Sequence, residues 1–153
     1  MLAASGGTGK IEVLQQELKV ARAIGGVLAG IVIAFVVVLA IEMIGIQIFP
    51  QPPGMNPLDS ESVRLHLSEI STGSFLAVLV AWTVAAFVGP VVTRRIAGAT
   101  PRWPALTVAA LFAALCAYNL ATVPMPPWML PAAVVLVVLA SWLGLRSQVW
   151  VHT

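Results

Sequence analysis

Four long apolar segments constrain this 153-residue chain more than any other feature. They cover residues 23–48, 74–93, 104–123 and 128–146, and each is close to the roughly 20 residues that a helix needs to cross a bilayer. With 59% hydrophobic and 9% charged residues the chain cannot form an ordinary soluble core, because soluble domains carry about a quarter charged residues. The sequence therefore predicts an all-α integral membrane four-helix bundle, forming one domain over residues 1–153 in a lipid bilayer.

The basic residues predict how these spans are oriented. Seven of the eight Lys and Arg residues flank span ends that would face one side of the membrane: Lys10, Lys19, Arg22, Arg94, Arg95, Arg102 and Arg146. Under the positive-inside rule that side is the cytoplasm. We expect a multi-pass protein of the bacterial inner membrane with both termini cytoplasmic. The net charge of +2 is then a topology signal, and no nucleic-acid partner is expected.

A short helix is predicted just before the first span. Within residues 10–22, Ile11, Leu14, Leu18 and Ala21 follow a 3,4,3 spacing with charges between them, which is typical of an amphipathic helix. This cytoplasmic helix could lie on the bundle or at the membrane interface, or it could pair with a partner as a coiled coil. Its length of fewer than two heptads favours the first interpretation.

A second short helix is predicted between the first two spans. Asn56 precedes Pro57, and Asp59 follows in what would be the first turn, a pattern that favours the start of a helix. Apolar side chains then recur on one face. The sequence therefore predicts an amphipathic extracytoplasmic helix over residues 57–71.

Small residues recur every fourth position inside the first three spans. The residues expected to form helix-packing contacts are Gly26, Gly30, Ala81, Ala85, Ala109 and Ala113. Small side chains allow helix backbones to approach closely, which matters because lipid provides no hydrophobic drive for helices to associate. We predict that the second and third spans pack along their alanine stripes. The GxxxG motif predicts a packing contact, with homodimerisation the lesser alternative.

One ionisable acid, Glu42, lies within an apolar segment. Counted at about 1.5 Å per residue from the cytoplasmic start of the first span, Glu42 lies near the outer side of the membrane. Tyr118, Asn119 and Thr122 lie at a similar level. These four residues predict a polar cluster in the outer leaflet. We expect them to satisfy one another structurally rather than to handle a ligand or protons, although intramembrane acids are functional candidates by default.

No other pattern predicts catalytic, cofactor-binding or metal-binding residues. The Gly-rich string before Lys10 lacks both the first glycine and the Ser or Thr of a phosphate-binding loop. Cys116 is the only cysteine, so no internal disulfide can form. The two histidines, His66 and His152, are expected at opposite faces of the membrane. We therefore do not expect an enzyme.

Several loop and cap motifs carry a family resemblance. They are Pro52-Pro53-Gly54, Pro57, Asp59, the Thr72-Gly73-Ser74-Phe75 entry and the Arg94-Arg95 exit. With them the chain resembles small four-span bacterial inner-membrane proteins of unassigned function. The resemblance covers most of the chain and implies the same fold. It implies no activity and no catalytic residues.

The sequence favours a non-enzymatic accessory or scaffold subunit that engages another membrane protein, a second copy of itself, or lipid. A small transporter or a component of an oligomeric channel is the alternative. Transporters usually have interrupted helices and polar residues near the membrane midplane. Here the middles of the last three spans are mostly Ala, Val and Leu, which argues against transport.

Overall fold

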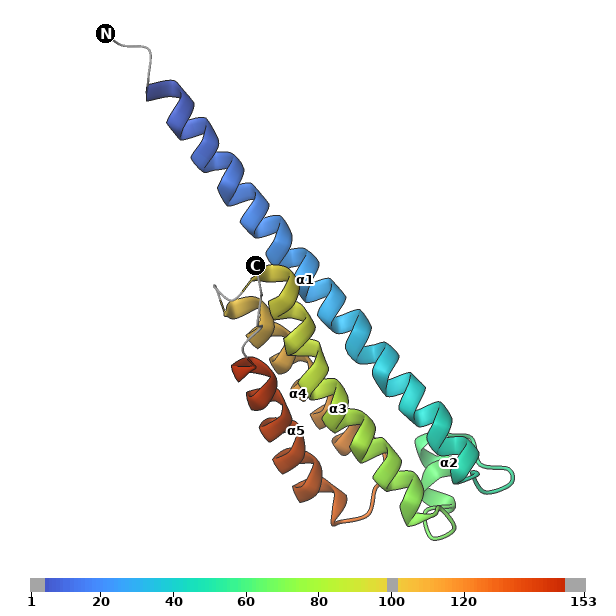
Figure 1. Ribbon diagram of the computed structural model, residues 1–153. Coiled ribbons are helices and arrows are strands. Elements are labelled where there is room, and N and C mark those ends of the chain that lie inside the picture. The colour runs from blue at the N-terminus through green and yellow to red at the C-terminus, as the bar shows by residue number, and fades with distance from the viewer. Residues whose placement is uncertain (1–4, 99–101, 148–153) are drawn as a thin grey trace.

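A computed structural model describes residues 5–98 and 102–147, with side chains from residue 9 onward. This part of the chain contains no strand. Its helices are α1 (Ser5–Ile48), α2 (Ser60–Leu65), α3 (Thr72–Ala97), α4 (Trp103–Thr122) and α5 (Met129–Arg146) (Figure 1). Of these, α1, α3, α4 and α5 are long and apolar enough to cross a membrane. The prediction of an all-helical chain with four candidate spans is therefore confirmed, and it is compatible with a multi-pass membrane protein.

The first helix is much longer than a single span. Its 44 residues correspond to about 66 Å, against a hydrocarbon core about 30 Å thick. The segment predicted as a separate cytoplasmic helix joins the first span without a break, and Figure 1 shows it projecting beyond the ends of the other helices. Every residue from 9 to 22 is exposed. The extension therefore stands clear of the other helices and does not lie on the bundle, one of the two positions that the favoured interpretation allows.

Helix α3 lies at the centre of the molecule and packs against α1, α4 and α5. Its closest approach to α1 involves the predicted GxxxG motif. A Cβ atom added at Gly26 would lie 2.9 Å from the carbonyl oxygen of Thr93, and one added at Gly30 would lie 2.8 Å from that of Gly89. Both glycines are therefore occupied by a contact within the chain, which leaves neither free to pair two copies.

The alanine stripes pack only in part as predicted. Ala81 and Ala85 on α3 are fully buried and Ala109 on α4 is nearly so, but Ala113 is exposed. Four residues turn a helix by about 400°, so a stripe at every fourth position rotates by about 40° per step. The stripe of α4 thus leaves the packed face after Ala109, and the prediction for Ala113 is wrong.

Helix α2 is shorter than the helix predicted over residues 57–71. Asp59 rather than Asn56 is its N-cap, accepting a hydrogen bond from the Glu61 N–H at 3.1 Å. The Asn56 side chain instead accepts from Leu58 N–H in a local turn, which competes with an earlier helix start. Glu61 pairs with Arg64 at 2.6 Å, and this hydrogen bond lowers the pKa of the exposed Glu61 carboxyl.

An arginine joins the end of α3 to the end of α5. The Arg94 guanidinium donates to the carbonyl oxygens of Leu145 and, at 3.2 Å, of Ser147. The last carbonyls of a helix lack partners within the helix and carry partial negative charge. Arg94 therefore stabilises the end of α5, a role beyond the topology signal that its sequence position predicts.

Candidate functional site

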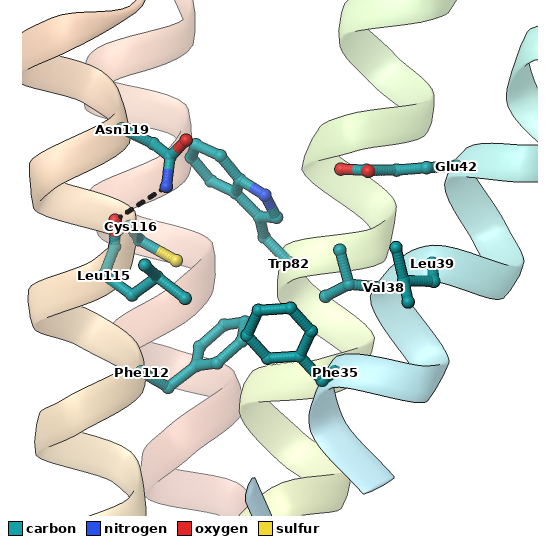
Figure 2. Close-up of a pocket in the computed structure, with 9 residues that line it drawn as sticks. All are labelled: Phe35, Val38, Leu39, Glu42, Trp82, Phe112, Leu115, Cys116 and Asn119. Atoms are coloured by element: carbon teal, nitrogen blue, oxygen red, sulfur yellow. Dashed lines mark hydrogen bonds between the residues drawn. The ribbon is translucent and has the colours of Figure 1, made fainter. Parts of the chain in front are cut away.

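Three polar side chains from three different helices meet at one pocket. Glu42 comes from α1, Trp82 from α3 and Asn119 from α4, and the pocket that they line measures about 200 Å³. Figure 2 shows the Glu42 carboxylate reaching from its helix toward the indole of Trp82 and the Asn119 amide. The remaining lining is apolar: Phe35, Val38, Leu39, Phe112, Leu115 and Cys116. We call this cavity the Glu42 pocket.

Burial and a hydrogen bond hold two of these three side chains in place. Trp82 lies on the packed face of α3 and is 6% exposed. The Asn119 side chain donates to the Leu115 carbonyl one turn earlier, at 3.0 Å, which orients its amide and leaves the side-chain oxygen available as an acceptor. Glu42 is half-buried, one turn before the buried Gly45. It is the one acidic group that lines the pocket.

Two further pockets adjoin the Glu42 pocket and share residues with it. The one nearer to α2, which we call the outer pocket, measures about 270 Å³ and is also lined by Glu42, Trp82 and Asn119. The inner one measures about 130 Å³ and shares Phe35, Phe112 and Leu115. Its other lining residues are Ile31, Ala34, Val108 and Leu111. We call the three pockets together the trough, which lies between α1 and α4 and is apolar at its inner end and polar at its outer end.

The structure brings together two of the four residues of the predicted polar cluster. Glu42 and Asn119 line the same pocket, whereas Tyr118 is 65% exposed and Thr122 is also exposed. The Thr122 hydroxyl donates to the Tyr118 carbonyl at 2.8 Å, within its own helix. Neighbouring residues on a helix point about 100° apart, so Asn119 can face the pocket while Tyr118 faces outward. Among the described residues, Glu42 and Asn119 form no hydrogen bond with each other.

Trp82 packs against its neighbours and also lines the pocket, although nothing in the sequence marks it as a site residue. The sequence does contain a signal for the α4 side of the site. Phe112, Cys116 and Asn119 follow an i, i+4, i+7 spacing, which places them on one helix face. That spacing distinguishes Asn119, which shares a helix face with the pocket residues Phe112 and Cys116, from Tyr118, which does not.

The groups that line the Glu42 pocket are suited to binding a ligand. Its polar groups are a carboxylate, an amide and an indole N–H, and the Cys116 thiol also lines it. Within residues 9–98 and 102–147, no cluster of three His, Cys, Asp or Glu residues could hold a metal ion. A lone carboxylate beside an acceptor amide is suited to a cation or a hydrogen-bond donor.

Comparison with protein-family models, curated proteins and solved structures finds no match to this chain.

Proposed function

We propose that the protein is a non-enzymatic accessory or scaffold subunit of the bacterial inner membrane, and that it docks a helix of another subunit along α1. The observation that carries this proposal is the exposed extension of α1. Helices in proteins gain most of their stability from tertiary packing. Over residues 9–22, however, α1 is exposed at every residue. An extension without such packing within its own chain is therefore a natural docking element.

A continuous apolar seam runs along this helix. The 3,4,3 spacing of the extension continues into the span, so that the seam has three heptads: Ile11, Leu14, Leu18, Ala21, Gly25, Leu28 and Val32. Gly25 is half-buried and the other six are exposed. A Cβ atom added at Gly25 would meet nothing within 4 Å, so this position has room for a neighbouring helix. Seams of three to four heptads are long enough for coiled-coil pairing, which removes the length argument against it.

A second copy of the chain is the partner that best matches the seam. Two copies in one membrane share an orientation, so their α1 helices run parallel. In a parallel coiled coil, the residue that precedes Leu18 on one helix faces the residue five places later on the other helix. Glu17 would then face Arg22 of the second copy, with opposite charges. Gly26 and Gly30 do not take part, because they already contact α3.

The same proposal includes a membrane arrangement. The ends of α3 and α5 and the start of α4 lie at the end of the molecule from which α1 projects, and α2 lies at the other end (Figure 1). The basic residues cluster at the first end, so we assign it to the cytoplasm. The four long helices then form a membrane bundle with α2 outside it.

Photo-crosslinking from the two sides of α1 tests the docking proposal. A photoreactive residue at Leu18, on the seam, should give a discrete adduct in membranes, whereas one at Gln16, on the opposite side, should not. An adduct of twice the 16.1 kDa chain mass identifies a second copy, and another single mass identifies a different subunit. Equal labelling from the two sites, or no adduct from either, would reject docking along the seam.

A further inference from the structure

The trough has a polar end, an apolar length and a narrow width, and these three properties restrict what can occupy it. Its polar groups lie at the outer end, where Glu42 is six residues before the end of α1. Its apolar part extends inward to Ile31, eleven residues before Glu42. That separation corresponds to about 16 Å along the helix, about half of the roughly 30 Å hydrocarbon core. The trough therefore spans about one leaflet.

The width of the trough excludes a helix. Helices α1 and α4 contact each other, and the inner pocket measures only about 130 Å³. A helix with its side chains is about 10–12 Å across, so a helix could only lie over the trough and not enter it. A single acyl chain is thin enough to enter between Phe35, Phe112 and Leu115.

The charge of the outer end selects the headgroup. A carboxylate held among apolar side chains is costly unless a cation or hydrogen-bond donors compensate it. None of the residues lining the trough is Lys or Arg, and the one salt bridge in the described part of the chain joins Arg64 to Glu61. A primary ammonium group could donate to both Glu42 and the free side-chain oxygen of Asn119, and could contact the ring of Trp82.

We infer that the trough binds one outer-leaflet phospholipid with a primary-amine headgroup, such as phosphatidylethanolamine, with the ammonium group at Glu42 and one acyl chain along Phe35 and Leu115. The lipid would enter sideways from the bilayer. This site differs from the docking seam, which ends before Phe35, so either assignment can fail without the other.

Native mass spectrometry of the full chain, released from detergent, tests this site. The probes are phosphatidylethanolamine, phosphatidylcholine and phosphatidylglycerol with identical acyl chains. Wild-type protein should bind the first at least about tenfold more tightly than the other two, because only a primary ammonium combines positive charge with three N–H donors. Glu42→Gln should abolish most of that preference. The matched control is Glu69→Gln, which also removes one acid near the outer end but at an exposed position, and it should keep the preference.

Two further measurements keep the proposal open to rejection if Glu42→Gln does not fold. A phosphatidylethanolamine probe with a photoreactive group in its acyl chain should label wild-type peptides that contain Phe35 or Leu115. Labelling elsewhere only would overturn the site. Equal binding of the three lipids, or an unchanged preference in Glu42→Gln, would also overturn it. If free ethanolamine displaces the bound lipid, the site binds a soluble amine instead, as expected of a transporter. That outcome would overturn the lipid assignment.

Discussion

At the scale of single residues, the contact between α1 and α3 depends on the absence of a side chain at Gly30. A Cβ atom there would overlap the Thr93 hydroxyl and lie 2.8 Å from the backbone oxygen of Gly89. Gly30→Ala should therefore lower the stability in detergent by about 1–3 kcal/mol, the usual cost of overpacking. Gly25→Ala is the matched control, because a Cβ there has open space and alanine favours a helix. Equal melting temperatures for the two variants would contradict the contact.

Arg94 and Arg95 are neighbours with the same charge and different surroundings. The Arg94 guanidinium caps the end of α5, while Arg95 is exposed. Arg94→Gln should lower the free energy of unfolding by about 1.5–3 kcal/mol, the range for hydrogen bonds to a charged group, and Arg95→Gln should change it by less than about 0.5 kcal/mol. Both variants remove one positive charge, so an effect on topology alone would be the same for both. Thermal unfolding in one detergent distinguishes these outcomes.

At the scale of whole helices, the effect of replacing a stripe alanine by a larger residue depends on whether that alanine faces a neighbouring helix. Ala81 is fully buried on the central helix, and Ala113 is exposed on α4. Ala81→Leu should cost about 1–3 kcal/mol through overpacking, whereas Ala113→Leu should leave the melting temperature nearly unchanged because it adds an apolar side chain to an exposed face. A large loss of stability in Ala113→Leu would mean that α4 packs on that face after all.

The sequence predicts helices better than it predicts their faces. The four candidate spans can be recognised from the sequence because length and hydropathy are properties of one segment and need no knowledge of its neighbours. The face that a helix buries depends on which helices surround it. Central α3 packs against three other helices, so its rotating stripe stays buried, while the same spacing on peripheral α4 exposes Ala113. That Glu42 and Asn119 line one pocket is predictable from their depth, but the contribution of Trp82 is not, because a large apolar ring has no chemical signature of a site.

At the scale of the whole molecule, the projecting extension of α1 is the largest difference from the sequence-based expectation. The amphipathic residues 10–22 taken alone are too short to pair as a coiled coil. The structure has no break there, and the seam runs through the boundary between the extension and the span. Hydropathy changes at this boundary while the helix does not, so a division based on hydropathy separates two parts of one structural element.

The proposed membrane topology rests on which end of the molecule carries the basic residues, and cysteine accessibility can test it. In a Cys116→Ala background, Glu12→Cys lies on the exposed extension and Leu58→Cys lies near α2 at a position that is 94% exposed. A membrane-impermeant thiol reagent added to spheroplasts should label Cys at position 58 and should label position 12 only after permeabilisation, because the positive-inside rule places the extension in the cytoplasm. The reverse pattern would invert the protein. It would also place Glu42 in the inner leaflet, so that the trough would draw its lipid from the cytoplasmic side while the seam on α1 faced partners outside the cell membrane.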